Sequence, residues 1–226
     1  NKQDLALQNS YQQEIETYRE EIRSEFGFVG AESSIINSVS LRNVWIGPGA
    51  LIDGVNKLSN SCILSSLDRS TIVRDGAIVE HSLLQRGTCV ESMAWVCDSL
   101  LLEASSASRH ARLRYTIIAS NSHIKGGEIS NSLIGPFVGL HHQAHIASLL
   151  WPKGAGSIGA GALISGDAMG RTPNREALIG EGITFGQGVT LLFPINLSQS
   201  PWSFVSAGSV LTSQQLSFPF SLIRNR

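Results

Sequence analysis

Apolar residues recur at every sixth position over most of this chain. Four runs show the spacing: Ile46, Ile52, Leu58 and Leu64; Ile72, Ile78, Leu84, Val90 and Val96; Ile134, Leu140, Ile146, Pro152, Ile158 and Ile164; and Ile179, Phe185, Leu191 and Leu197. An amphipathic helix has a period of about 3.6 residues, and a half-buried strand has a period of about two. The period of six therefore predicts short strands joined by turns, with one inward-pointing side chain on each strand.

A longer repeat overlies the shorter one. Four similar triplets begin at Ser82, Ser99, Thr116 and Ser132, at steps of 17, 17 and 16 residues. Three short strands thus complete one coil, and successive coils can hydrogen-bond about 4.8 Å apart. A single coil could not bury its own apolar side chains, so the coils must stack. The pattern predicts an all-β protein, a parallel β-helix of roughly ten coils over residues 31–215.

Two interruptions break the repeat. Leu64 and Ile72 are eight residues apart, so two extra residues should bulge outward between them. Residues 166–176 depart from the period altogether and predict a loop outside the coil. Loops on a rigid scaffold often carry function, and Arg171 and Arg175 would suit phosphate or nucleotide binding. A solvated excursion without function fits the same residues.

The two ends differ from the repeat. Residues 12–23 contain strong helix formers, with apolar residues at helical spacing and no Gly or Pro. We expect residues 1–30 to form a helix that either covers the open end of the β-helix or connects it to an upstream domain. We expect residues 216–226 to form a C-terminal tail. The proline-containing stretch 193–220 predicts an irregular segment that caps the open end of the β-helix.

The composition is that of an ordinary core-forming protein. The chain has 226 residues, a net charge of −1, and 42% hydrophobic and 15% charged residues. Nucleic acids and anionic membranes attract basic surfaces, so we expect neither as a partner. Three cysteines without zinc-like spacing argue against a disulfide framework and favour a reducing, cytoplasmic location. Because the chain starts at Asn1 without a methionine, we expect a processed chain or a piece of a larger protein.

The six-residue spacing resembles that of the hexapeptide-repeat family. This resemblance implies that the β-helix is left-handed, although the spacing itself does not show the hand. It also implies a homo-oligomer, most often a trimer, in which flat faces pair and sites form between subunits.

The stretch that begins at His145 resembles the acetyltransferase domain of the bifunctional enzymes that synthesise UDP-N-acetylglucosamine. The matching parts are His145, then Ser157-Ile158-Gly159-Ala160-Gly161, the loop from Gly166, and Leu178-Ile179-Gly180-Glu181-Gly182. The resemblance implies that His145 is a general base, that acetyl-coenzyme A is the donor, and that the N–H group of Ala160 stabilises an oxyanion. The acceptor would be a sugar or a sugar nucleotide.

The chain departs from that family at positions near the substrate. Ser148 stands where the family has a tyrosine, Ser157 replaces an asparagine, and Gly166-Asp167 replaces an Asn-Tyr pair. Ser148, Ser157, Ala160, Asp167, Arg171 and Arg175 are the corresponding candidate substrate- or cofactor-binding residues. The acceptor should therefore differ from the family's acceptor, or catalysis is absent and His145 is a polar turn residue.

A second resemblance leads to another function. The repeated Ser-Leu-Leu triplets and the segment Asn131-Ser132-Leu133-Ile134-Gly135 look like the β-helices appended to sugar-nucleotide pyrophosphorylases. In those proteins the β-helix assembles or regulates the enzyme, and an upstream domain transfers the nucleotide. A non-catalytic module of this kind is the alternative hypothesis.

Histidines also raise the question of a metal. Four of the six lie between residues 123 and 145, and this grouping resembles the zinc-binding β-helices of γ-class carbonic anhydrases. Their paired histidines are five residues apart, and no pair here has that spacing. His123 should also stack beside Gly139 rather than His141. We therefore expect no metal, with His123 and His142 as weak candidates, and we expect His81 and His110 to lie on surface turns.

Overall fold

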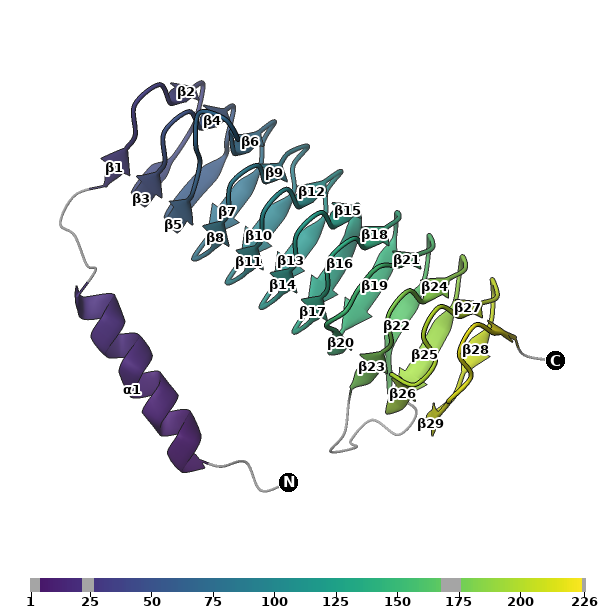
Figure 1. Ribbon diagram of the computed structural model, residues 1–226. Helices are drawn as coiled ribbons and strands as arrows, with labels where there is room; N and C mark the ends of the chain where they lie inside the picture. The colour runs from purple at the N-terminus through teal and green to yellow at the C-terminus, as the bar shows by residue number, and fades with distance from the viewer. Residues whose placement is uncertain (1–4, 22–26, 168–175, 225–226) are drawn as a thin grey trace.

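In the part of the chain that the structure describes, one α-helix precedes one long parallel β-helix (Figure 1). The computed structural model describes residues 5–21, 27–167 and 176–224. The helix α1 spans Leu5–Glu21, and strands that pair in parallel with the strands one turn before and after follow it. The predicted all-β, parallel β-helical fold with an N-terminal helix is confirmed.

Three faces make up the β-helix, and we number them in the order in which the chain reaches them from Phe28. The first face consists of β1 (Phe28–Val29), the ends of β3 (Leu41–Ile46) and β5 (Lys57–Ile63), β8 (Leu83–Leu84), β11 (Leu100–Leu101), β14 (Ile117–Ile118), β17 (Leu133–Ile134), β20 (Leu149–Trp151), β23 (Ala177–Ile179), β26 (Ile195–Leu197) and β29 (Gln214–Gln215).

The second face is a separate ladder of eleven strands, one from each turn. It consists of β2 (Ser34–Ile36), β4 (Leu51–Asp53), β6 (Ile72–Arg74), β9 (Cys89–Val90), β12 (Ser106–Ser108), β15 (His123–Lys125), β18 (Gly139–Leu140), β21 (Ser157–Ile158), β24 (Thr184–Phe185), β27 (Phe204–Val205) and β30 (Leu222–Ile223).

The third face leads back to the first. It consists of the beginnings of β3 and β5, then β7 (Ile78–Glu80), β10 (Trp95–Cys97), β13 (Arg112–Arg114), β16 (Gly127–Ser130), β19 (Ala144–Ala147), β22 (Leu163–Asp167), β25 (Thr190–Phe193) and β28 (Val210–Leu211). The strands β3 and β5 each bend around the corner between the third and first faces.

The register confirms the longer sequence repeat. On the first face Leu83 pairs with Leu100, Leu100 with Ile117, and Ile117 with Leu133, at the same steps of 17, 17 and 16 residues. Successive side chains on a strand point to opposite faces, so the residue after each of these points inward. Those inward residues are fully buried: Leu84, Leu101, Ile118 and Ile134.

Four predicted interior positions were wrong by one residue. Leu64, Ile72 and Ile78 are only half-buried and Pro152 is exposed, whereas their chain neighbours Ile63, Val73, Val79 and Trp151 are fully buried. Two adjacent apolar residues satisfy a period of six equally well, and only the pleat decides which of them faces inward.

Trp151 illustrates what that correction means for packing. Its ring meets the Phe185 ring edge-on at a centroid distance of 5.9 Å, and its indole N–H donates to the Gly180 carbonyl at 2.7 Å. A tryptophan fits the interior here because its polar N–H has a buried partner.

The predicted bulge after Leu64 is present but larger than expected. Cys62 pairs with Leu83, which makes this turn four residues longer than the one before it, where Trp45 pairs with Cys62. Ser66 and Arg69 close the excursion by exchanging backbone hydrogen bonds of 3.3 and 3.0 Å. The prediction of two extra residues failed because it started from the wrong interior residues.

The ladders continue beyond both ends of the predicted range. Phe28 pairs with Trp45, and Val205 pairs with Ile223. The stretch 193–220, predicted to be irregular, contains regular strands because Ile195, Leu197 and Val205 supply buried interior residues. The predicted loop 166–176 begins later than expected, since Gly166 and Asp167 still belong to β22; residues 168–175 lie outside the described residues.

The helix α1 is drawn apart from the coils in Figure 1. Leu5, Tyr11 and Ile15 are each more than half exposed. Within the described residues, no helix is both long enough and apolar enough to span a bilayer.

Candidate functional site

His145 projects outward from the middle of the third face. Its neighbours on β19, Ala144 and Ile146, are buried, so the alternation of the strand directs the imidazole to the surface. The backbone pairs His145 with Glu128 on the preceding turn, and the Glu128 Oε2 atom lies 3.9 Å from the His145 Nδ1 atom. About half of each side chain is exposed, 48% for His145 and 54% for Glu128.

Ser148 follows β19 at the corner between the third and first faces. Its φ is +52°, its N–H donates to the Ser130 carbonyl, and its own carbonyl accepts from the Ala177 N–H at 3.1 Å. Ala177 is the first residue of β23, just after the predicted loop. The strand that carries His145 is therefore joined directly to the chain that returns from that loop.

The other predicted loop residues are only partly described. Asp167 ends β22, where its backbone pairs with Phe193. Arg171 and Arg175 lie outside the described residues.

Ser157 and Ala160 lie around the corner from His145. Ser157 is on the second face, between Gly139 and Thr184. Ala160 lies in the following turn, where its carbonyl accepts from the Gly188 N–H at 2.9 Å. That turn leads to Leu163, the residue paired with His145. Ala160 thus lies just before β22, the strand that pairs with the His145 strand, whereas Ser157 remains on the second face.

The two weak metal candidates do not converge. His123 pairs with Gly139, as its register predicted, and its Nδ1 atom lies 2.9 Å from the Ser106 hydroxyl. The Nε2 atom of His142 lies 3.1 Å from the Arg109 guanidinium. The guanidinium at Nε2 leaves only Nδ1 of His142 as a candidate metal ligand.

One column of side chains runs along the corner between the third and first faces. Each member has a positive φ between +47° and +52°, the left-handed conformation that Asn and Asp tolerate better than most other non-glycine residues. The column consists of Asn43, Asn60, His81, Asp98, Tyr115, Asn131 and Ser148. The prediction that His81 and His110 lie on surface turns agrees with their exposure and positive φ.

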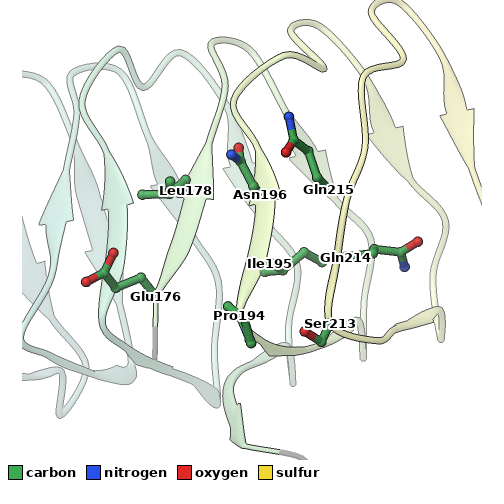
Figure 2. A pocket seen from close by; sticks show the side chains of 8 residues that line it. All are labelled: Glu176, Leu178, Pro194, Ile195, Asn196, Ser213, Gln214 and Gln215. Atoms are coloured by element: carbon green, nitrogen blue, oxygen red, sulfur yellow. The ribbon is translucent and has the colours of Figure 1, made fainter. Parts of the chain in front are cut away.

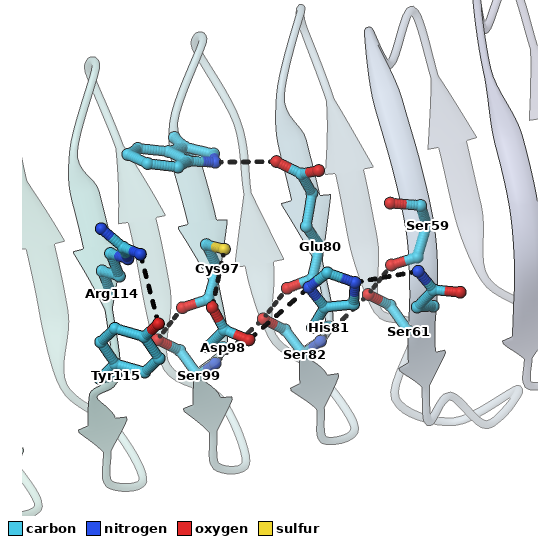
Figure 3. Close-up of polar contacts among 12 residues, drawn as sticks. Ser59, Ser61, Glu80, His81, Ser82, Cys97, Asp98, Ser99, Arg114 and Tyr115 are labelled. Atoms are coloured by element: carbon cyan, nitrogen blue, oxygen red, sulfur yellow. Dashed lines mark hydrogen bonds and ion pairs between the residues drawn. The ribbon is translucent and has the colours of Figure 1, made fainter.

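A buried hydroxyl follows several members of this corner column. Ser99 is typical: its hydroxyl donates to the Cys97 carbonyl at 2.7 Å (Figure 3). It also accepts from the Thr116 N–H of the next turn at 3.1 Å. Ser82 makes the same pair of bonds one turn earlier, to Glu80 and from Ser99. These hydroxyls supply acceptors for N–H groups at the corner, and the carbonyls to which they donate also accept an N–H from the next turn.

Three potential metal ligands meet at this corner, two from the corner column and one, Cys97, from the end of β10. The Nδ1 atom of His81 lies 3.6 Å from the Asp98 Oδ1 atom, and the Cys97 thiol donates to Asp98 Oδ2 at 3.2 Å (Figure 3). One ligand atom from each residue lies within 4.8 Å of the other two. Burial above all, followed by the hydrogen bond to Asp98, raises the pKa of the Cys97 thiol to about 11.

The first face bears an apolar stripe over nine successive turns. Phe28 and Trp45 stack with ring centroids 5.2 Å apart, and Trp45, Ile117 and Leu150 remain 38–39% exposed. The stripe consists of Phe28, Trp45, Cys62, Leu83, Leu100, Ile117, Leu133, Leu150 and Leu178.

An open groove of about 370 Å³ begins at the end of the apolar stripe, where Leu178 belongs to both (Figure 2). It is lined by Glu176, Leu178, Pro194, Ile195, Asn196, Ser213, Gln214 and Gln215. Among these residues Glu176 alone is charged, so the described part of the groove offers amides and one carboxylate but no cation for a phosphate.

Comparison with known proteins places the chain in a family. The model of a family described as "Domain of unknown function (DUF4954)" matches residues 1–224. The chain belongs to the DUF4954 family. A curated "Uncharacterized protein" of Treponema pallidum (strain Nichols) is 24% identical over 203 residues, which are 90% of this chain and 28% of that relative. The chain thus spans little more than a quarter of the relative's length.

One similar solved structure bears the description "putative acetyltransferase", from Desulfovibrio desulfuricans G20. The match covers 88% of this chain and 68% of the other, at 8% identity and a TM-score of 0.18. Similarity at that level carries no argument about the function of this DUF4954 chain.

Sequence reasoning missed the cluster of His81, Cys97 and Asp98 in this DUF4954 chain. Taken singly, His81 is a turn residue and Cys97 an isolated cysteine. The signal was present in the coil repeat, because His81 and Asp98 are separated by the 17 residues of one turn. Residues one turn apart occupy the same corner of neighbouring coils.

Proposed function

We propose that this chain is an acyltransferase-like β-helix in which His145 is the general base. The observation that carries the proposal is the pair of His145 and Glu128 on the open third face, at 3.9 Å. A carboxylate near Nδ1 favours the tautomer that carries its proton on Nδ1. The Nε2 atom is then left to accept a proton from an acceptor molecule.

The proposed reaction transfers an acyl group from coenzyme A. The acceptor O–H or N–H attacks the thioester carbonyl carbon while Nε2 takes its proton. The tetrahedral intermediate then collapses, its C–S bond breaks, and the coenzyme A thiolate takes the proton from the imidazolium. Acceptor and donor are converted to the acylated acceptor and free coenzyme A, so atoms and charge balance.

The resemblance to the UDP-N-acetylglucosamine-synthesising enzymes supports acetyl-coenzyme A as donor and a sugar or sugar nucleotide as acceptor. Arg171 and Arg175 would bind phosphate, Ala160 would supply an oxyanion donor, and Ser148, Ser157 and Asp167 would contact substrate. The hydroxyl of Ser148 in place of a tyrosine supports an acceptor different from that family's. A homo-oligomer, with a trimer favoured by the same resemblance, would close the open third face.

Release of free thiol from acetyl-coenzyme A tests this function. Purified chain is incubated with a panel of amino sugars and sugar nucleotides, and the free thiol is titrated. Removing a general base costs a factor of about 10²–10⁴, so His145→Ala should lower turnover at least 100-fold. The matched control is His141→Ala, which removes an exposed histidine from the preceding corner. Absence of turnover with every acceptor, or full turnover by His145→Ala, would reject the proposal.

The apolar stripe on the first face supports a second function, association with another copy of this chain. A stripe without charged residues is complementary to itself, because pairing it with its copy brings no like charges together. Soluble proteins seldom leave so long an apolar surface unpaired. In this function the β-helix is an assembly module, alone or within a longer protein.

Sedimentation velocity tests association directly. Ile117→Arg places a charge in the middle of the apolar stripe and should convert the oligomer to monomer. Phe204→Arg makes the same kind of change at an exposed apolar residue of the second face and should leave the oligomer intact. A wild-type chain that sediments as a monomer, or equal dissociation by both variants, would count against this interface.

A further inference from the structure

We propose that His81, Cys97 and Asp98 form a binding site for a divalent transition-metal ion of the zinc class. The side chains come from two adjacent turns at the corner between the third and first faces (Figure 3). The site lies apart from His145 and is independent of acyl transfer.

The donor set suits such an ion. Thiolate sulfur, imidazole nitrogen and carboxylate oxygen are the ligands that zinc uses in proteins. Zinc bonds of about 2.0–2.3 Å in a tetrahedron place ligand atoms about 3.3–3.6 Å apart. The observed separation of His81 Nδ1 from Asp98 Oδ1 is 3.6 Å, and Cys97 Sγ lies 3.2 Å from Asp98 Oδ2. These two separations involve different oxygens of Asp98, and one ligand atom from each residue lies within 4.8 Å of the other two, so the side chains must rotate to bring all three around one ion.

The backbone already holds two ligands in the required positions. His81 and Asp98 have φ of +47° and +48°, so each extends from the same corner of its turn. The Asp98 N–H donates to the Glu80 carbonyl, and the Ser99 hydroxyl holds the Cys97 carbonyl. Little ordering of the chain is needed on binding, which favours affinity.

A neighbouring amide can orient the imidazole. A metal-bound histidine usually donates its other ring N–H to an oxygen. The Asn60 amide lies 2.9 Å from His81 Nε2, with its nitrogen toward the ring, and its oxygen accepts from Asn43. If both amides turn over, Asn60 Oδ1 accepts from His81 Nε2–H, and Asn60 Nδ2 donates to Asn43. The same contacts then leave His81 Nδ1 free to bind the ion.

The surrounding charges balance. A thiolate, a carboxylate and a neutral imidazole around a divalent ion give no net charge. Glu80 is engaged by Lys57 and by the Trp95 indole, so it does not act as a fourth ligand. The Arg114 guanidinium is held over the Tyr115 ring at 4.8 Å and bonds its hydroxyl.

Three protein ligands leave a fourth coordination position open. The His81 side chain is 52% exposed and that of Asp98 is 32% exposed, so solvent or an external ligand can reach the ion. Zinc sites that keep an open position generally act on a bound water or substrate, whereas structural sites are closed by four ligands.

Cobalt(II) is the probe for the test, because a cobalt–thiolate bond gives a near-ultraviolet charge-transfer band. Chelator-treated chain is titrated with Co²⁺, and Zn²⁺ is then added to displace it. The wild type should bind one ion per chain and show the band. Cys97→Ser should lose the band, and Asp98→Asn, which keeps a residue that tolerates the left-handed corner, should weaken binding at least tenfold.

The remaining cysteines supply the controls. Cys62→Ser and Cys89→Ser remove thiols on the first and second faces and should keep the band unchanged. Thermal unfolding of each variant, followed by circular dichroism, separates loss of the site from loss of the fold. A wild type without the band, or a band that persists in Cys97→Ser, would overturn the assignment.

Discussion

His81 and His145 both project from the β-helix, yet their surroundings differ. His81 lies in a corner, where it contacts Asn60 on the preceding turn and Asp98 on the next. His145 lies in the middle of a flat face, and the ion pair described for it is the one with Glu128 at 3.9 Å. At a corner of a β-helix, side chains from successive turns project from the same place and form one column. On a face, the outward side chains are distributed across a flat surface.

This difference separates two ways of building a site. The corner assembles its ligands within one chain, so the fold alone completes the cluster at His81. The face offers His145 as a single group, and the proposed reaction needs the loop region or a second subunit to enclose it. The His81 site should consequently tolerate dissociation of an oligomer, while turnover at His145 should not.

The largest effect should come from emptying the interior of the turn that carries His145. Trp151→Ala removes a fully buried side chain and should lower the free energy of unfolding by about 3–5 kcal/mol, measured by denaturant titration. Turnover at His145 should fall sharply. Cobalt binding at His81 should persist because stacked turns interact mainly with their neighbours.

The matched control is Trp202→Ala, in which the lost ring is 51% exposed and the expected change is below about 1 kcal/mol. If Trp151→Ala abolishes cobalt binding as well, the two sites belong to a single cooperative unit and are not independent.

A smaller loss should follow from removing one corner hydroxyl. Ser99→Ala deprives the buried Thr116 N–H of its acceptor, and an unsatisfied buried donor costs about 1–3 kcal/mol. Because Ser99 also holds the Cys97 carbonyl, cobalt affinity should fall in the same variant, with turnover unchanged. Ser108→Ala, on the second face, serves as the control. Equal cobalt affinity in wild type and Ser99→Ala would show that the corner hydroxyl does not position the thiol.

The sequence predicted the coils better than the sites, for a physical reason. Interior positions repeat because the side chains of every turn fill the same triangular interior. The spacing between Leu84 and Leu101 therefore gives the number of residues in one turn. The inward residue is less well determined where two apolar residues are adjacent, as at Leu64 and Pro152. Outward side chains are not required to fill the triangular interior, so their chemistry varies from turn to turn, and which of them meet depends on the register.

The cluster at His81 shows where prediction could have gone further. Once the step of 17 residues is known, His81 and Asp98 fall on one corner, and Cys97 is beside it. The length of the bulge between Leu64 and Ile72 does not affect this pair, since both residues follow it. The amide of Asn60 and the acceptor for Ser99 could not be predicted, because they depend on the left-handed corner conformation.

A third prediction tests whether Glu128, on the third face, supports His145 in the proposed reaction. Glu128→Gln keeps the size of the side chain but removes its negative charge beside His145. If Glu128 supports the imidazolium, kcat should fall about tenfold, equivalent to about 1.4 kcal/mol, with cobalt binding unchanged. Glu181→Gln, which alters an exposed carboxylate elsewhere, is the control. An unchanged kcat in Glu128→Gln would leave His145 without a positioning partner.

The smallest expected effect is a gain in cobalt affinity, and it is the effect most specific to the corner. A carboxylate at position 43 can only accept hydrogen bonds, so Asn43→Asp should force the Asn60 amide nitrogen toward residue 43. Asn60 Oδ1 then faces His81 and accepts from Nε2–H, which is the arrangement that frees Nδ1 for the metal. Hydrogen bonds to a charged group contribute about 1.5–3 kcal/mol, but only the difference between the two amide orientations counts, so cobalt affinity should rise a few-fold.

Asn131→Asp makes the same change farther along the corner column and should have no effect on cobalt affinity. A fall in affinity in Asn43→Asp would mean that the metal, if it binds, does not use His81 Nδ1.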